Sequence, residues 1–294
     1  MHALFDVPAP AKLNLFLHVT GRRHDGYHLL QSVFMLIDWH DTLHFETRSD
    51  GRISREDIGA VLPDEDLTVR AARALQVFAP AGVGAHIALE KRIPSQAGMG
   101  GGSSDAASCL LALNRLWGLH LPLSVLVAIG LKLGADVPFF LHGCNAWVEG
   151  IGDSIQPIDI PNGRFVVVKT SQGLDTKAIF SHPALTRDSE TATISGFAAD
   201  PFGFGQNDLQ AVAQCLCPGV TDALNWLRDR GLQGRMTGSG SAVFAQMRQD
   251  AGPIKTSAEW GDVPGNWQLR ECVNLGVHPL VGWAPSDDSS VGSV

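Results

Sequence analysis

The chain has 294 residues, of which 45% are hydrophobic and 18% are charged, and its formal net charge is −8 at pH 7. This composition is typical of a globular protein, and the length favours two domains. The negative charge argues against a general nucleic-acid or membrane-surface binder, so an anionic ligand would need a local positive pocket.

The cysteine count and the hydropathy pattern both favour a cytoplasmic protein. The 5 cysteines are odd in number and contain no C-x-x-C pair, as expected for unpaired thiols in a reducing compartment. The N-terminus lacks the basic and then apolar pattern of a signal peptide. The most apolar stretch, residues 121–140, is interrupted by Pro122, Lys132, Asp136 and Pro138 and is not expected to span a membrane.

The first half of the chain mixes strand and helix patterns. Residues 11–19 alternate in polarity, which predicts a strand with its leucines on one face and Lys12 and Asn14 on the other. Residues 135–140 resemble a further strand, which Pro138 excludes from the centre of a sheet. Other strands are predicted over residues 32–39, 41–47 and 86–90, and helices over residues 67–78, 106–117 and 123–133.

A segment rich in Gly, Pro and Asp, residues 150–163, predicts a domain boundary. We expect an N-terminal domain over residues 1–155, a C-terminal domain over residues 156–285, and a disordered tail over residues 286–294. In the second half, a strand is predicted over residues 165–169, a helix over residues 220–230, and a second glycine-rich turn within residues 236–247.

The most informative segment, residues 94–108, reads PSQAGMGGGSSDAAS. Its glycines allow the backbone to approach a ligand closely, and the helical pattern that follows places a helix N-terminus beside them. Such an N-terminus presents unpaired N–H groups and the positive end of the helix dipole, which suit a phosphate group. The alternative is a surface turn with a good N-cap, but it does not explain so many glycines together.

Other familiar motifs do not fit the chain. The glycine segment lacks the Lys-Ser or Lys-Thr of a Walker loop, and its spacing does not match a dinucleotide-binding fingerprint. No G-x-S-x-G elbow of a serine hydrolase occurs. His24 and His28 flank Gly26 in a turn, so they do not form the helical pair of a zinc site.

Two charged residues remain candidates for catalysis on their positions alone. Asp136 follows the glycine that ends a predicted helix, where it could serve the turn or a reaction. Lys12 could be a solvated strand residue, but Asn14 on the same face would complete a polar floor.

The glycine segment resembles the P-x3-G-L-G-S-S-A-A signature of the galactokinase, homoserine kinase, mevalonate kinase and phosphomevalonate kinase (GHMP) superfamily. Further segments resemble one branch of it in the same order along nearly the whole chain: residues 10–17 with Gly26-Tyr-His28, residues 133–139 and residues 237–242. The resemblance implies a two-domain α+β fold with the active site in the cleft between an N-terminal and a C-terminal α+β domain. It also implies a kinase that uses ATP and Mg²⁺ to phosphorylate a small molecule bearing cytidine diphosphate, with no nucleic-acid or membrane partner.

The resemblance also implies roles for individual residues. Asp136 would be the catalytic base and Lys12 its neighbour. The ATP-binding residues would be Pro94, Gly98, Met99, Gly100, Gly101, Gly102, Ser103 and Ser104. The substrate-binding residues would be Asn14, Tyr27, His28, Thr176 and Phe180, with Tyr27 and Phe180 stacking on cytosine and His28 reading its edge.

The chain departs from the family pattern at two positions, and several questions stay open. Met99 replaces the usual Leu, and Asp66 stands where relatives often carry Asn near the adenine. The Mg²⁺ ligands are unassigned, with Ser103 and Ser104 as candidates, and both a monomer and a homodimer are compatible with the sequence. Alternative functions are a kinase of the homoserine or mevalonate type and a non-catalytic ligand-binding member of the superfamily.

Overall fold

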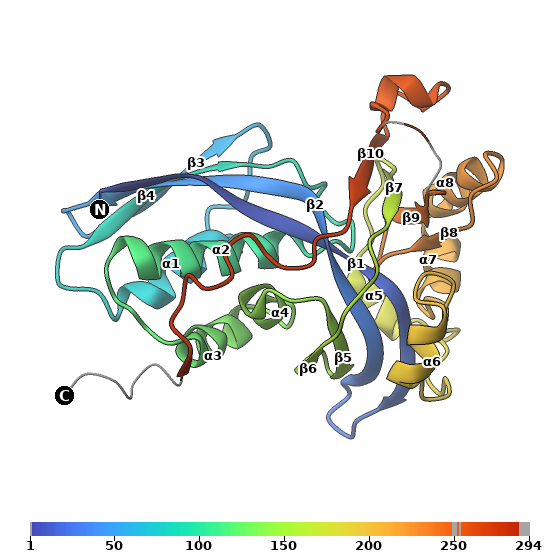
Figure 1. Cartoon of the computed structure of the whole chain (residues 1–294), viewed down its shortest axis with the longest axis horizontal. Coiled ribbons are helices and arrows are strands. Elements are labelled where there is room, and N and C mark those ends of the chain that lie inside the picture. The colour runs from blue at the N-terminus through green and yellow to red at the C-terminus, as the bar shows by residue number, and fades with distance from the viewer. Residues whose placement is uncertain (1, 249–251, 253, 288–294) are drawn as a thin grey trace.

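Two sheets with flanking helices are joined by two long strands that run through the molecule (Figure 1). The structure is a computed structural model that describes residues 2–248, 252 and 254–287. The first sheet has the order β3-β4-β2-β5-β6, with β1 also paired to β2. Its strands are β1 (Ala3–Arg22), β2 (His28–Arg48), β3 (Ile53–Ile58), β4 (Gly84–Glu90), β5 (Ala146–Gly150) and β6 (Ser154–Pro157).

Four helices cover one face of the first sheet (Figure 1). They are α1 (Leu67–Gln76), α2 (Gly101–Leu116), α3 (Leu123–Leu133) and α4 (Val137–His142). The apolar spacing in the sequence predicted α2, and its residues Ala106, Leu110 and Leu113 are fully buried against the sheet and α1. The helix begins earlier than predicted, because Gly101 already follows the left-handed residue Gly100 into the helical turn.

The second sheet has the order β10-β7-β9-β8, and all its pairs are antiparallel. Its strands are β7 (Arg164–Lys169), β8 (Gly234–Met236), β9 (Val243–Gln246) and β10 (Gln268–Val273). The helices of this half are α5 (Thr176–Ser181), α6 (Ile194–Ala199), α7 (Gln210–Leu216), α8 (Pro218–Arg228) and the 3₁₀ turn η1 (Ser257–Trp260). Within the described ranges, no helix is long and apolar enough to cross a membrane.

Strand β1 contributes side chains to the cores of both halves, because a bulge interrupts the alternation of its side chains between the two faces. The register against β2 shifts between Asn14 and Leu17. As a result, Phe16 is fully buried with Leu15 in a core shared by both sheets, whereas Leu17 belongs to the core of the second half. The predicted single face of leucines is therefore wrong beyond Leu15, since an extra residue in one strand turns the following side chains over.

Two predicted elements differ from the structure. The separate strands predicted over 32–39 and 41–47 are one strand, β2, which passes through His40 without a turn. The strand-like run over 135–140 is instead helix α4. Pro138 lies in the first turn of α4, where its missing N–H costs no hydrogen bond. Short apolar runs fit either structure, which is why the pattern was ambiguous.

After β10 the chain returns to the first half and runs along α2 toward α3 (Figure 1). Leu280 is buried in the core of the first half, and the Leu123 N–H donates to the carbonyl of Pro285. The predicted boundary at residue 155 falls within β6 and stays a prediction. Of the predicted disordered tail, residues 288–294 lie outside the described residues, while Asp287 accepts a hydrogen bond from Ser124.

Candidate active site

A cavity of about 700 Å³ opens between the two halves of the molecule, within the range typical of small-molecule sites. Both long strands, the glycine segment, the start of α4, the start of α5 and the turn before β9 contribute to its wall. Most of the residues that the family resemblance implied line this cavity: Lys12, Asn14, Pro94, Gly98, Met99, Gly100, Gly101, Gly102, Ser103, Asp136, Thr176 and Phe180.

Lys12 is a buried lysine on β1, with only 3% of its surface exposed. Its ammonium donates to Asn14 Oδ1 at 2.5 Å and to the carbonyl of Gly98 at 2.9 Å. Burial lowers the pKa of Lys12 from its ordinary value, and the negative charge of Asp136 partly offsets this. The predicted polar floor is confirmed, because Lys12 and Asn14 do share one face of the strand.

Asp136 occupies the position just before α4, but its side chain does not cap that helix. Its Oδ2 lies 3.8 Å from the ammonium of Lys12, and its side chain is 32% exposed. Gly134 ends α3 and Val137 already begins α4, so Asp136 lies in the short connection between the two helices, where it lines the cavity wall. A partly solvated carboxylate beside a buried cation can accept a proton or orient a hydroxyl group.

The glycine segment delivers the N-terminus of α2 to the cavity. Gly100 precedes the helix with a φ of 72°, and no side chain caps the first turn. The N–H groups of the first helical residues, Gly101 to Ser103, have no partners within the helix. A Cβ on Gly100 would lie 2.9 Å from the ring of Phe140 and 3.3 Å from Lys12 Cγ, so only glycine fits. This end of the helix is suited to an anion.

The two glycine-rich turns of the sequence contact each other through their backbones. A Cβ on Gly98 would lie 2.2 Å from the carbonyl oxygen of Thr237, and one on Gly238 would lie 2.6 Å from the carbonyl oxygen of Gly98. The hydroxyl of Thr237 accepts from the N–H of Asn14 at 2.9 Å. The second turn therefore holds the first against β1, and Gly238, Ser239 and Gly240 also line the cavity.

The two serines after the glycines differ in their surroundings. Ser104 is fully buried, and its hydroxyl donates to the carbonyl of Pro10 at 2.7 Å. Its N–H already donates to the carbonyl of Gly100 within the helix. Ser103 lines the cavity wall and Ser104 does not, and the implied place of Ser104 in the ATP site stays a prediction.

The implied cytidine site is only partly assembled. The rings of His28 and Phe180 are stacked with centroids 5.1 Å apart, and Arg187 Nε donates to His28 Nε2 at 3.1 Å. Tyr27 is 61% exposed and, within the described residues, its ring does not contact Phe180. Of these rings only Phe180 lines the cavity. In this structure Phe180 stacks on His28, and the implied sandwich of cytosine between Tyr27 and Phe180 stays a prediction.

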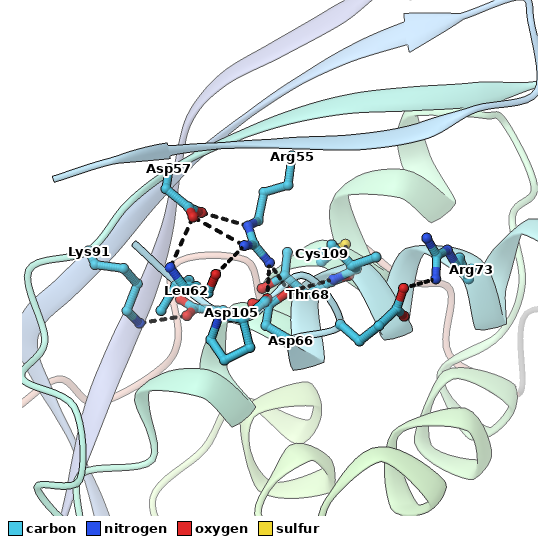
Figure 2. A network of polar contacts seen from close by, with 12 residues as sticks. Arg55, Asp57, Leu62, Asp66, Thr68, Arg73, Lys91, Asp105 and Cys109 are labelled. Carbon is cyan, nitrogen blue, oxygen red and sulfur yellow. Dashed lines mark hydrogen bonds and ion pairs between the residues drawn. The ribbon is translucent and has the colours of Figure 1, made fainter. Parts of the chain in front are cut away.

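The sequence analysis missed a buried charge cluster beside the first turn of α2 (Figure 2). Lys91 forms ion pairs with Asp41 and, at 2.6 Å, with Asp105. Burial raises the pKa of Asp105 well above its ordinary value, and Lys91 opposes this shift. Lys91 and Asp105 both line the cavity. No local signal could reveal the cluster, because its members lie far apart in the sequence.

The structure brings a cation, a carboxylate and an unpaired helix N-terminus to one cavity, which is an arrangement suited to phosphoryl transfer. Sequence comparison agrees with this geometry. The sequence model of the GHMP kinase N-terminal domain matches residues 66–144, and that of the GHMP kinase C-terminal domain matches residues 195–258. The chain belongs to the GHMP kinase family.

Full-length relatives place the chain within this family more narrowly. A protein of Albidiferax ferrireducens is 66% identical over 100% of both chains, and one of Variovorax paradoxus is 65% identical over 97% of this chain and 100% of its own. Both are named 4-diphosphocytidyl-2-C-methyl-D-erythritol kinase. A crystal structure of 4-(cytidine 5′-diphospho)-2C-methyl-D-erythritol kinase has a TM-score of 0.76 and 32% identity, covering 92% of this chain and 98% of its own.

A more distant structure shares the fold. A homoserine kinase from Cytophaga hutchinsonii has a TM-score of 0.66 and 16% identity, covering 94% of this chain and 95% of its own. The implied two-domain α+β kinase fold is confirmed by these comparisons.

Proposed function

We propose that the protein transfers the γ-phosphoryl group of ATP to the 2-hydroxyl of 4-(cytidine 5′-diphospho)-2-C-methyl-D-erythritol, a step of the non-mevalonate pathway to isoprenoid precursors. The observation that carries this proposal is the Lys12–Asp136 pair, which faces the same cavity as the α2 N-terminus. Full-length relatives that carry this kinase name at 66% and 65% identity support the choice of substrate.

In this reaction the ATP phosphates lie against the N-terminus of α2. The free N–H groups of Gly101 to Ser103 and the helix dipole neutralise part of their charge. Lys12, fixed by the Gly98 carbonyl and Asn14, stands beside the transferring group and stabilises the charge that spreads over its oxygens. Positioning of this kind accounts for most of the catalysis in phosphoryl transfer.

Asp136 accepts the proton of the attacking hydroxyl. As the O–H bond breaks, the hydroxyl oxygen forms a bond to the γ-phosphorus, and the bond to the β–γ bridging oxygen breaks to release ADP. The ammonium of Lys12, 3.8 Å from the Asp136 carboxylate, attracts it and helps to hold it beside the attacking hydroxyl.

Mg²⁺ would enter with the nucleotide. It prefers oxygen ligands and is usually held by one or two protein groups together with substrate phosphates. Ser103 and Asp136 are oxygen-bearing residues of the cavity wall that fit this requirement, whereas the Ser104 hydroxyl is engaged by Pro10. When bound, the ion would neutralise charge on the β- and γ-phosphates.

The cytidine half of the acceptor would contact Phe180, with Thr176 on the same wall. We also propose a cytoplasmic location, since all five cysteines, Cys109, Cys144, Cys215, Cys217 and Cys272, are unpaired.

A coupled assay for ADP release tests the proposal with four acceptors in parallel. We expect turnover with 4-(cytidine 5′-diphospho)-2-C-methyl-D-erythritol and none with 2-C-methyl-D-erythritol 4-phosphate, homoserine or mevalonate. Turnover of homoserine or mevalonate would instead identify another kinase of the family. ATP binding without turnover of any acceptor would identify a non-catalytic member.

A further inference from the structure

One connection, residues 170–175 between β7 and α5, carries the side of the cavity that would receive the acceptor. Leu174, Thr176 and Phe180 line the cavity from this side and are called the acceptor wall below. The hydroxyls of Thr176 and Ser239 lie 2.7 Å apart, so the start of α5 also contacts the second glycine-rich turn. The position of the connection therefore decides where the acceptor wall stands.

Lys169, the last residue of β7, is a buried lysine with 5% of its surface exposed. Its ammonium donates to the carbonyl of Thr170 at 2.6 Å and to that of Gln172 at 2.7 Å. Among the residues that the structure describes, no carboxylate forms an ion pair with it. Burial lowers the pKa of Lys169 from its ordinary value. The ammonium is therefore held by two neutral carbonyls of the connection that follows its own strand.

Such a lysine lowers the stability of the fold. Neutral carbonyls compensate only part of the desolvation of an ammonium, whereas an opposite charge compensates more. The adjacent hydroxyl of Thr170 is also buried and, within the described ranges, has no hydrogen-bond partner. Natural proteins keep features that cost stability mainly where function needs them.

The carbonyl of Gln172 also links the connection to the glycine segment. The Ser241 hydroxyl donates to it at 2.5 Å, and the Ser241 N–H donates to the carbonyl of Gln96 at 3.1 Å. A Cβ on Gly173 would lie 1.9 Å from Gln96 Oε1, so the connection rests directly against the glycine segment. Lys169 thus fixes the connection at the point where it meets the rest of the cavity.

The glycine segment has anchors that do not involve Lys169. The N–H of Lys12 donates to the carbonyl of Met99 at 3.0 Å, and its ammonium donates to that of Gly98 at 2.9 Å. Both bonds tie the segment to β1. A change at Lys169 should therefore displace the acceptor wall and leave the α2 N-terminus in place.

We infer that Lys169 is a positioning residue for the acceptor, whose ammonium holds the connection after β7 and so places the acceptor wall, although the fold would be at least as stable without it. A purely structural lysine would have the opposite effect on stability. This inference rests on the proposed binding of the cytidine substrate beside α5.

Lys169→Met tests the inference, because methionine nearly matches lysine in length and donates no hydrogen bond. We expect the KM for the cytidine substrate to rise about tenfold, the effect of losing one hydrogen bond from a charged donor. The KM for ATP and kcat should stay close to those of the wild type. The melting temperature should stay the same or rise, because the desolvated ammonium is removed and the Gln172 carbonyl keeps Ser241 as a donor.

Two control variants separate position from charge and from stability. Lys132→Met removes the same charge at an exposed residue outside the cavity wall and should change none of these values. Leu227→Ala removes a fully buried side chain from the core of the second half, outside the cavity wall. It should lower the melting temperature and leave both KM values unchanged. A KM for the cytidine substrate that rose as much in Leu227→Ala would show that this constant reports stability, and the inference would fall.

Three results for Lys169→Met would also overturn the inference. They are an unchanged KM for the cytidine substrate, an equal rise in the KM for ATP, and a clear loss of stability or failure to fold, which would make Lys169 a structural residue. Failure of the proposed function would look different, because the wild-type protein itself would then show no turnover of the cytidine substrate.

Discussion

The ammonium of Lys12 lies 3.8 Å from the carboxylate of Asp136, yet the two side chains differ sharply in exposure, at 4% and 32%. Lys12 is fixed by two further hydrogen bonds, whereas Asp136 does not even cap its own helix. The pair therefore combines a rigid, desolvated cation with a carboxylate that remains open to a substrate.

The carboxylate should be needed for turnover and not for folding. Asp136→Asn is expected to lower kcat by about 10²–10⁴, the usual contribution of a general base. The melting temperature and the affinity for ATP should stay close to those of the wild type, because Asp136 makes no capping hydrogen bond. Steady-state kinetics and thermal unfolding would check both, and a variant that kept more than about a tenth of the activity would contradict the role of Asp136.

The Lys12–Asp136 pair predicts that the affinity for ATP depends on pH. Burial lowers the pKa of Lys12 and Asp136 raises it, so Asp136→Asn should lower this pKa further. ATP affinity should fall as Lys12 loses its proton, and the midpoint of this fall should lie at a lower pH in the variant. Calorimetric titrations between neutral and alkaline pH would measure it. Lys132→Met, which removes an exposed lysine, is the control and should leave the midpoint in place.

The lowered pKa of Lys12 also predicts how the free energy of unfolding changes with pH in the absence of ligand. Between the lowered pKa of Lys12 and its ordinary value of 10.5, the unfolded chain binds more protons than the folded one. The free energy of unfolding should therefore rise with pH in this window through Lys12, and Lys12→Met should remove that contribution. A contribution of the opposite sign would mean that the ion pair outweighs the desolvation of Lys12.

The glycine before α2 should be required for ATP. Gly100→Ala places a Cβ 2.9 Å from Phe140 and 3.3 Å from Lys12, so the loop or the lysine must move. We expect the KM for ATP to rise much more than that for the acceptor. Gly118→Ala is the matched control, because Gly118 also has a positive φ but meets no atom within 4 Å. Both variants carry backbone strain of about 1–2 kcal/mol, and only the first should lose ATP affinity.

The local parts of the site could be predicted from the sequence. The phosphate-binding helix follows from the glycines and the spacing after them, and the proximity of Lys12 to Asn14 follows from the two-residue period of a strand. Asp136 was found by its place after a helix stop and by family resemblance. The sequence does not predict its helix, because the short apolar run around Pro138 fits a strand equally well.

The parts that could not be predicted depend on contacts between distant segments. The bulge after Asn14, which moves the following side chains of β1 to the opposite face, has no local signature in the sequence. Lys91 meets Asp41 across 50 positions, and Arg187 meets His28 across 159. Only the folded chain brings such groups together, so neither the charge cluster nor the partner of His28 could be inferred from spacing.

A buried histidine should make the protein acid-sensitive. Burial lowers the pKa of His278 from 6.5 to about 4, and the ring is only 1% exposed. Below pH 6.5 the unfolded chain binds the extra proton first, so stability is lost as the pH falls toward 4. At pH 5 this loss is about 2 kcal/mol. His278→Asn, which can still accept from the Leu280 N–H, should show a smaller difference in urea unfolding between pH 7 and pH 5.

The stacked rings of His28 and Phe180 predict which half of the acceptor this wall recognises. Base–aromatic stacking contributes about 1–3 kcal/mol in nucleic-acid-binding proteins. Phe180→Ala should therefore raise the KM for the cytidine substrate by about tenfold or more and leave the KM for ATP unchanged. Tyr27→Ala should act in the same direction only if Tyr27, which is 61% exposed here, closes over the bound base. Steady-state kinetics with each substrate varied in turn would measure both effects.

The hydrogen bond from Arg187 also predicts how His28 reads the base. Because an arginine only donates, His28 Nε2 must be the acceptor, and a neutral ring then carries its proton on Nδ1. Burial and the charges of Arg187 and Arg22 lower the pKa of His28, which keeps the ring neutral near pH 7. The Nδ1–H can then donate to N3 of cytosine, an acceptor, but not to N3 of uracil, which bears a proton. His28→Ala should therefore reduce the preference for the cytidine substrate over its uridine analogue, measured as the ratio of their kcat/KM values. Arg187→Gln should reduce it less, because the ring remains, and an unchanged ratio in His28→Ala would show that another group reads the base.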